Sequence, residues 1–210
     1  MGQSGEQTTS AKGAGTRIQK RNRDAILDAG LEVFSVEGFR GATLDAIARH
    51  AGLSKPNLLY YFPSKEAVYV ALLERLLETW LDPLQALNPS GDPVAEILAY
   101  MRRKLAMSRD FPRESRLFAG EVLRGAPQIG DVLRGELKDL VDERARVIAG
   151  WSDRGQIAPV DPHHLIFSIW SLTQHYADFD AQVSAVLGDT DPFPGAEAHL
   201  EQMFLRLLQP

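Results

Sequence analysis

The chain has 210 residues and a formal net charge of −5, with 44% hydrophobic and 24% charged residues, which is typical of a globular protein with a substantial core. It contains no cysteine, so disulfides, thiolate metal sites and thiol catalysis are excluded. No apolar run approaches the roughly 18 residues needed to cross a bilayer. The first twenty residues are polar and lack the apolar segment of a secretion signal, so we expect a cytoplasmic protein.

Charge is distributed unevenly along the chain. Residues 1–65 contain nine Lys and Arg against six Asp and Glu, whereas residues 66–210 contain fourteen against twenty-two. A basic segment joined to an acidic one suggests that the basic segment meets a polyanion, because Lys and Arg pair with phosphates. The bias favours nucleic acid as the partner of residues 1–65.

The N-terminal residues 1–16 have no hydrophobic period and are predicted to form a disordered arm. From Arg17 the pattern becomes helical and predicts a first helix that ends at Gly38, a residue suited to a C-cap. The apolar face of this helix consists of Ile26, Leu27, Leu31, Val33 and Phe34.

Two short helices are expected next. Thr43 is a suitable N-cap for a helix that ends before Gly52, and Ser54 is a suitable N-cap for the one that follows. Leu58 and Leu59 are predicted to point inward from this third helix.

A fourth helix begins at Ser64 and carries the clearest apolar stripe, in which residues recur at spacings of three and four. The stripe consists of Tyr69, Leu72, Leu73, Leu76, Leu77, Trp80 and Leu81. The helix is expected to stop before Pro83. Further helices are predicted at about residues 92–109, 113–125, 128–152, 162–181 and 195–208. Since no strand alternation appears, the predicted fold is all-α.

Residues 43–62 have the layout of a helix-turn-helix. Gly52 lies at the turn, where a positive φ is required. The second helix opens with Ser54, Lys55 and Asn57, which suit base edges and phosphates in a DNA groove. Hydroxyl and ammonium donors follow that could hold backbone phosphates. They belong to Tyr60, Tyr61 and Lys65.

This segment resembles the TetR family of repressors. The matching residues are Thr43, Ile47, Ala48, Ala51, Gly52, Ser54, Tyr60, Phe62 and Lys65. The resemblance implies a DNA-binding domain at residues 17–65, an effector-binding and dimerisation domain at residues 66–210, and a homodimer that binds a palindrome in double-stranded operator DNA. Pro56 stands where the family usually has glycine or another small residue, so the operator sequence stays open.

A cluster of basic residues lies at the start of the predicted first helix. Its role has two alternative interpretations. It is either a solubilising group of charges or an arm that follows phosphates and enters the adjacent minor groove. The cluster consists of Arg17, Lys20, Arg21 and Arg23. The predicted DNA-binding residues are thus Arg17, Thr43, Ser54, Lys55, Asn57, Tyr60, Tyr61 and Lys65.

A second candidate site lies on the helix predicted at 162–181. Trp170, Gln174 and Asp178 fall at i, i+4 and i+8 and therefore share one helical stripe. An aromatic wall beside an amide and a carboxylate suits a small, flat, polar ligand, and glutamine can both donate to and accept from a cyclic imide. The same mixture of residues is also typical of a dimer interface or a satisfied core.

Longer stretches are similar to TetR-family regulators of pyrimidine utilisation, namely residues 57–67, 80–84, 115–118, 148–151 and 174–179. The resemblance implies control, mainly repression, of pyrimidine-degradation and nitrogen-metabolism genes, with uracil or thymine as the effector and no cofactor. With the stripe, it predicts effector-binding residues at Trp80, Leu81, Phe118, Trp170, Gln174 and Asp178. The alternative is a TetR-family repressor that responds to another small planar or multidrug ligand.

The last predicted helices are expected to form a four-helix bundle with a second chain. The apolar residues predicted at this interface are Phe167, Leu172, Phe204 and Leu207. No nucleophile–base pair, phosphate-binding glycine loop or clustered set of metal ligands is recognisable, so we expect neither an enzyme nor a metal sensor.

Overall fold

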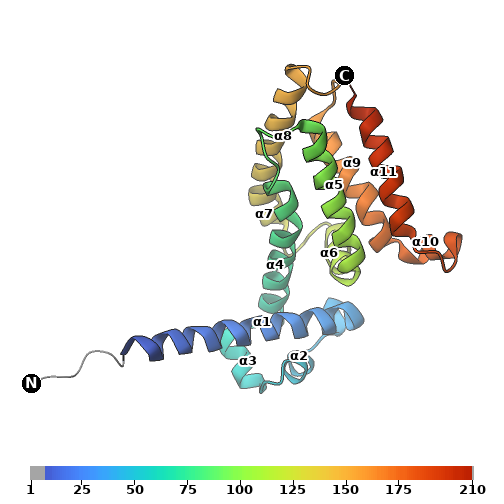
Figure 1. Ribbon diagram of the computed structural model, residues 1–210. Coiled ribbons are helices and arrows are strands. Elements are labelled where there is room, and N and C mark those ends of the chain that lie inside the picture. Colours follow the sequence, from blue (N-terminus) through green and yellow to red (C-terminus); the bar gives the residue numbers. More distant parts are fainter. Residues whose placement is uncertain (1–7, 210) are drawn as a thin grey trace, which may run out of the picture. The chain divides into compact units, whose positions relative to one another are not determined.

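The computed structural model describes residues 8–209, which form helices and no strand, so the all-α prediction is confirmed (Figure 1). The elements are α1 (Thr8–Gly41), α2 (Leu44–His50), α3 (Lys55–Tyr61), α4 (Lys65–Gln85), α5 (Pro93–Asp110), α6 (Pro112–Leu123), α7 (Gly130–Val132), the π-helical segment η1 (Leu133–Leu137), α8 (Lys138–Asp153), α9 (Pro162–Asp178), α10 (Asp180–Leu187) and α11 (Pro192–Leu208). They belong to two compact units, residues 1–73 and residues 74–210.

Helix α1 begins earlier than predicted. Residues 1–7 of the expected disordered arm lie outside the described residues, but the chain is helical from Thr8, not from Arg17. This stretch has no hydrophobic period, yet Ala11 and Ala14 have high helix propensity. Extending an existing helix adds a hydrogen bond for each residue fixed, which favours continuation. At the other end, Gly38 has a φ of 67° and kinks the helix where the C-cap was predicted.

The core of the first unit joins α1 to the start of α4. The centroids of the Phe34 and Tyr69 rings are 4.9 Å apart. Val68 lies close to Gly30, because a Cβ added at Gly30 would be 3.1 Å from Cγ1 of Val68. The five apolar residues predicted on α1 are all buried. Because Val68 and Tyr69 pack into this core, the unit extends to residue 73, eight residues beyond the domain boundary expected at residue 65.

Helix α4 does not stop before Pro83, as predicted, but continues to Gln85. Proline removes one backbone donor and costs about 3 kcal/mol in a helix interior. Packing offsets this cost, because Leu84 is fully buried in the second unit. Arg103 also donates a hydrogen bond from Nη2 to the Pro83 carbonyl at 3.0 Å. The last turn of α4 is therefore held by its tertiary contacts.

The second unit is built around α5, which packs against α9 and α11 (Figure 1). Trp151 of α8 is fully buried in this core, and its indole N–H donates to the Pro89 carbonyl at 3.2 Å. Phe204, predicted at a dimer interface, is 0% exposed and belongs to this core, so that prediction is wrong. By contrast, Phe167 and Leu207 are 46% and 45% exposed.

Two predicted helices are divided. The segment expected at 128–152 consists of α7, η1 and α8. The helix expected at 162–181 ends at Asp178, and Phe179 separates it from α10, which begins at Asp180. Helix α11 starts at Pro192, because the Asp191 carboxylate caps it by accepting from the Phe193 N–H at 3.1 Å. Among the described residues, no helix is both long enough and apolar enough to cross a membrane.

Candidate functional site

Side-chain caps and one glycine define the α2–turn–α3 unit. Thr43 Oγ1 accepts from the Ala46 N–H at 3.1 Å, and Ser54 Oγ accepts from the Asn57 N–H at 3.3 Å. Each bond satisfies a backbone donor that has no partner in the first turn of its helix. Gly52 has a φ of 66°, in the left-handed region that favours glycine. The predicted caps and turn are confirmed.

Helix α3 has one buried and one exposed face. Leu58 is fully buried, whereas the side chains at the start of the helix are exposed. Leu59 is 38% exposed, so its predicted inward orientation is wrong: it lies about 100° around the helix from Leu58. The exposed face presents Ser54, Lys55, Asn57 and Tyr60, the last 71% exposed.

Lys55 is paired within the same unit. Its ammonium lies 2.8 Å from the Asp45 carboxylate of α2, with both side chains about half exposed. Pairs of this kind contribute about 1 kcal/mol or less, so Lys55 can exchange this partner for another anion at low cost. Tyr61 is held differently: its hydroxyl accepts from Asn22 Nδ2 of α1 at 3.0 Å. The hydroxyl proton of Tyr61 can still be donated to another group.

Lys65 has a position that the sequence did not predict. Its ammonium donates to the Ala42 carbonyl at 2.9 Å and lies 4.8 Å from the centroid of the Phe39 ring. These contacts tie the start of α4 to the end of α1, so Lys65 is a positioning residue for α2 and α3. Of the basic cluster, Arg23 lies over the Phe62 ring at 4.4 Å, while Arg17, Lys20 and Arg21 are exposed.

The second unit contains a cavity of about 500 Å³ between α6, η1 and α9. Its lining includes four of the six predicted effector residues, namely Phe118, Trp170, Gln174 and Asp178. Leu133 and Leu137 complete the apolar wall from η1. Single turns of π-helix are rare and frequently lie at functional sites. The predicted stripe on α9 is thus one wall of a real cavity.

Trp80 and Leu81 do not line this cavity, in contrast to the prediction. Leu81 lines a separate pocket of about 260 Å³ formed by α4, α7, η1 and α8, together with the carboxylates of Glu74, Glu78 and Glu136. Trp80 is buried beneath the ammonium of Lys104 on α5. Both residues belong to the apolar stripe of α4, and the stripe alone could not show which neighbouring helix each side chain contacts.

Hydrogen bonds fix the polar groups of the cavity. The Trp170 indole N–H donates to the Tyr100 hydroxyl at 2.5 Å, and Ser115 Oγ donates to Asp178 Oδ1 at 2.6 Å. Burial raises the pKa of Asp178, although Ser115, Arg116 and Lys104 oppose this shift. The cavity therefore offers a fixed aromatic wall, the Gln174 amide and an oriented carboxylate.

Lys104 is a residue that the sequence analysis missed. It is 3% exposed, and burial lowers the pKa of its ammonium to about 8, although the negative charge of Asp178 opposes the shift. A signal was available in the sequence. Lys104 follows Met101 by three residues and precedes Ser108 by four, so it interrupts the buried stripe of α5 with a charge. Perturbed ionisable groups of this kind concentrate at functional sites.

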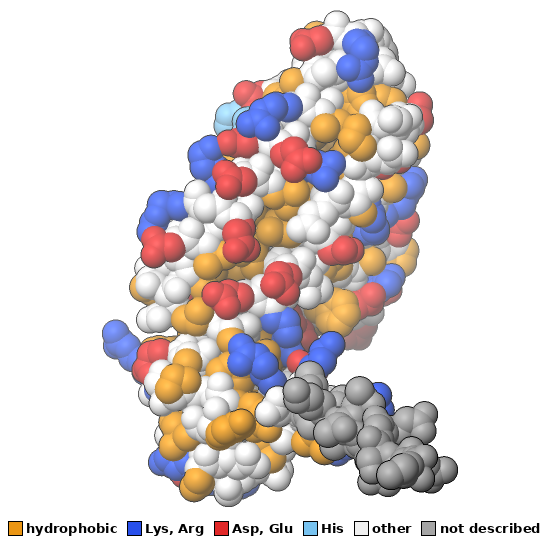
Figure 2. Space-filling view, turned by 90° about the vertical axis from the view of Figure 1, so that its left-hand side faces the viewer, with side chains coloured by type: hydrophobic (Ala, Val, Ile, Leu, Met, Phe, Trp, Pro, Cys, Tyr) orange, Lys and Arg blue, Asp and Glu red, His pale blue; other side chains and the backbone are white. Residues whose placement is uncertain are grey.

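Neither sign of charge dominates the face of the second unit that Figure 2 shows. On the face in Figure 2, acidic side chains alternate with Lys and Arg over a partly hydrophobic surface. Among the described residues, no group of three or more His, Asp and Glu is arranged to hold a metal ion. Among the described residues, the exposed face of α3 and the α6–α9 cavity are two arrangements suited to binding a partner.

Comparisons with known proteins agree on one family. Residues 26–72 match the model described as bacterial regulatory proteins of the tetR family, and residues 73–210 match the C-terminal region of YcdC-like protein. The chain is 53% identical over 178 residues to the HTH-type transcriptional regulator RutR of Escherichia coli, covering 85% of this chain and 84% of that protein. It is also 26% identical over 141 residues to the HTH-type transcriptional regulator UidR of Escherichia coli, covering 65% and 69%.

Solved structures share the fold. The fatty acid degradation regulator FadR from Bacillus halodurans superposes with a TM-score of 0.64 at 21% identity, covering 87% of this chain and 94% of that one. A TetR-like transcriptional regulator from Rhodococcus superposes with a TM-score of 0.65 at 22% identity, covering 88% and 94%. At this level of identity the likeness concerns the fold alone.

The buried ammonium predicts an unusual dependence of stability on pH. The unfolded chain keeps the Lys104 proton up to about its ordinary pKa of 10.5, whereas the folded chain releases it near pH 8. Between these values the unfolded state binds more protons, so stability rises with pH. The cost of burial, about 3 kcal/mol at pH 7, falls by about 2 kcal/mol by pH 9.5.

Urea unfolding of the wild type and Lys104→Met at both pH values measures this effect. The variant should be the more stable at pH 7, and the difference should shrink at pH 9.5. Lys138→Met is the matched control, because its exposed ammonium pairs with Asp142, which raises its pKa, and the proton is retained throughout this window. A difference for Lys104→Met that does not change with pH would contradict the burial of a charged ammonium.

Proposed function

Because the chain belongs to the TetR family of bacterial transcriptional regulators, we propose that its exposed α3 face reads a palindromic operator and that uracil or thymine releases it. The chain is a DNA-binding regulator and not an enzyme, as the sequence predicted. The genes proposed to be under its control, mainly by repression, are those of pyrimidine degradation and nitrogen metabolism. The observation that carries the effector proposal is the cavity wall of Trp170, Gln174 and Asp178.

The DNA interface is proposed on the α2–α3 unit. A recognition helix enters the major groove with its N-terminal residues, and Ser54, Lys55 and Asn57 are the exposed residues at this end of α3. The hydroxyl groups of Tyr60 and Tyr61 can donate hydrogen bonds to DNA phosphates. Thr43 and Arg17 are exposed, and their side chains can donate to phosphates as well. Lys65 supports this surface through the Ala42 carbonyl, and its ammonium has a further donor for a DNA phosphate.

A homodimer is proposed because one chain presents only one recognition helix. Successive major grooves lie roughly 34–36 Å apart, so two copies are needed to read both half-sites of a palindrome. Phe167 of α9 and Leu207 of α11 are exposed apolar side chains that pairing with a second copy would bury. This retains the predicted interface helices but removes Phe204 from the contact.

The cavity fits a small planar ring with polar edges. Its apolar residues can cover the faces of a ring, while the Gln174 amide both donates and accepts, as the edge of an imide requires. The carboxylate of Asp178 adds an acceptor for a ring N–H. The relative at 53% identity is named an HTH-type transcriptional regulator, RutR, which supports a role in transcription for this chain, whereas the effector is proposed from the cavity.

Helix α4 is the proposed route of coupling. Its first part packs in the unit that contains α2 and α3, and its second part, including Trp80, packs in the unit that contains the cavity. An effector that favours a different arrangement of α4 would change the separation of the two recognition helices. The size of the effect is limited by the difference in effector affinity between the two states.

A second candidate function is favoured by the size of the cavity. Its volume of about 500 Å³ and its apolar wall, which includes Val122, Leu123 and Phe179, would also accept a larger planar or multidrug ligand. A multidrug regulator would bind cationic dyes. A pyrimidine sensor would prefer a small neutral ring.

Substitutions on α3 should weaken operator binding in two distinguishable ways. Asn57→Ala removes a side chain suited to base edges and should weaken binding roughly tenfold, about 1.4 kcal/mol, to the preferred sequence. Lys55→Ala should weaken binding to all sequences and lower the slope of log affinity against log salt by about one.

The measurement is fluorescence anisotropy with DNA selected by the wild-type protein from a random pool, titrated at several salt concentrations. Lys138→Ala, a charge change of the same kind on α8, is the control and should bind as the wild type does. Operator affinity that is unchanged in both α3 variants would show that DNA meets another surface.

Removal of the cavity amide should reduce effector affinity. Gln174→Leu keeps the approximate volume but loses the donor and the acceptor, so uracil should bind about tenfold more weakly. Calorimetry with uracil, thymine and a cationic dye measures this change, with the exposed Gln156→Leu as the control. Tighter binding of the dye than of either pyrimidine would support the multidrug alternative instead.

A further inference from the structure

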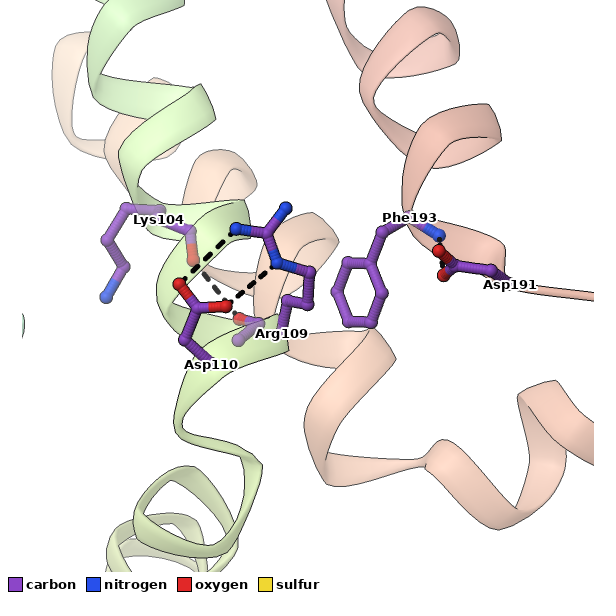
Figure 3. Close-up of polar contacts among 6 residues, drawn as sticks. Lys104, Arg109, Asp110, Asp191 and Phe193 are labelled. Carbon is purple, nitrogen blue, oxygen red and sulfur yellow. Dashed lines mark hydrogen bonds and ion pairs between the residues drawn. The ribbon is translucent and has the colours of Figure 1, made fainter.

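Helix α5 carries a charged group into the core of the second unit without giving it a partner. The Lys104 ammonium lies 5.0 Å from the centroid of the Trp80 ring, and no described residue accepts a hydrogen bond or ion pair from it. In Figure 3 its side chain leaves α5 away from the Arg109–Asp110 ion pair, and no dashed line reaches its nitrogen. The bond drawn at this residue is the one that Ser108 Oγ donates to the Lys104 backbone carbonyl.

A second unpartnered donor belongs to the same pair of side chains. The indole N–H of Trp80 is buried and has no acceptor among the described residues. Buried donors in folded proteins are nearly always paired, because leaving one unpaired forfeits its hydration without compensation. For an ammonium the penalty is larger still. The buried Trp80 N–H, together with the nearby Lys104 ammonium, which has no hydrogen-bond acceptor among the described residues, indicates a place for an acceptor from outside the chain.

The cluster also contains an acceptor and is joined to the cavity. The Asp178 carboxylate interacts electrostatically with the Lys104 ammonium, and it lines the α6–α9 cavity. Ser115 holds one of its oxygens at 2.6 Å, which leaves the other oxygen to accept from a ligand. The cavity lining therefore supplies an acceptor from α9, while the donors on α4 and α5 do not belong to that lining and are linked to it through Asp178.

The balance of charge restricts the chemistry of the ligand. Arg116 of the cavity lining is paired with Asp180 at 2.8 Å, which leaves the Lys104 ammonium and the Asp178 carboxylate as the charges to be matched. An anionic ligand would meet the charge of Asp178, and a cationic ligand would meet that of Lys104. A neutral molecule that places a carbonyl oxygen beside a ring N–H satisfies both groups at once, since the carbonyl accepts and the N–H donates. Lactams and cyclic imides have this arrangement.

We propose that Lys104 is an effector-binding residue whose ammonium, with the Trp80 indole N–H as the second donor, binds a carbonyl oxygen of a neutral lactam or cyclic imide while Asp178 accepts its ring N–H. This inference rests on the proposed function, because it assigns the polar end of the same effector site. It also gives Trp80 a role in that site as a donor, although its ring does not line the cavity wall.

Calorimetry of uracil binding to the wild type and to Lys104→Met at pH 7 tests the assignment. The variant should bind uracil at least tenfold more weakly, because a hydrogen bond from a charged donor is lost. Lys138→Met should bind as the wild type does. Lys104→Gln, which retains a neutral donor, should have intermediate affinity, and it replaces the methionine variant if that protein does not fold.

Uracil analogues that lack one carbonyl locate the contact. The 2-pyrimidinone and the 4-pyrimidinone each lack one of the two oxygens of uracil. The analogue that lacks the contacted carbonyl should bind the wild type at least tenfold more weakly than uracil does. Its affinity should be the same for Lys104→Met as for the wild type, since the carbonyl and the ammonium form a single interaction. A merely structural role of Lys104 would weaken all three ligands by the same factor.

The possible failures are distinguishable. Wild-type affinity for uracil in Lys104→Met, or equal losses for uracil and both analogues, would overturn the role of Lys104 and leave the proposed function intact. A wild-type protein that binds neither uracil nor thymine would overturn the proposed effector, and with it the ligand class inferred for Lys104.

Discussion

Helix α4 contributes side chains to two separate hydrophobic cores, and the proposed coupling between operator and effector depends on this constraint. Val68, Tyr69 and Leu72 are buried in the first unit, while Trp80 and Leu84 are buried in the second. Densely packed cores do not deform continuously, so in the proposed mechanism a helix held in both cores would transmit a displacement instead of absorbing it. The continuation of α4 through Pro83, held by Leu84 and by Arg103, extends its anchorage in the second unit.

The two functional regions depend on different kinds of interaction. The surface of α3 is positioned by a few local interactions. These are the helix caps at Thr43 and Ser54, the turn at Gly52 and the hydrogen bond from Lys65 to the Ala42 carbonyl. Its side chains can exchange one partner for another. Lys55, for example, can replace the exposed carboxylate of Asp45 by another anion. The proposed effector site instead keeps the Lys104 ammonium largely out of water at a cost in stability. Such a trade of stability for function is common at binding sites.

The local features of the fold could be predicted from the sequence because they depend on neighbouring residues. The caps, the positive φ of Gly52 and the buried face of α1 are set by residues within one or two helical turns, and the structure has each of them. The common helical face of Trp170, Gln174 and Asp178 could also be predicted, because the three residues lie on one helix.

Features that depend on distant contacts could not be predicted. The end of α4 is set by tertiary packing around Leu84, not by the local effect of Pro83. Phe204 and Phe167 have similar sequence surroundings, yet one is buried in the core and the other is exposed. The sequence shows Lys104 as a charge within the buried stripe of α5, but it could not show that α5 places this charge beside Trp80 and near Asp178.

The central claim is that operator binding and effector binding are coupled through one chain, and the most direct test is reciprocity. Coupling between two sites is mutual, so the factor by which uracil lowers operator affinity must equal the factor by which operator lowers uracil affinity. Calorimetric titration of uracil into the free protein and into the protein saturated with operator measures the second factor. We expect it to match the first, and a uracil affinity that is the same with and without operator would contradict the account.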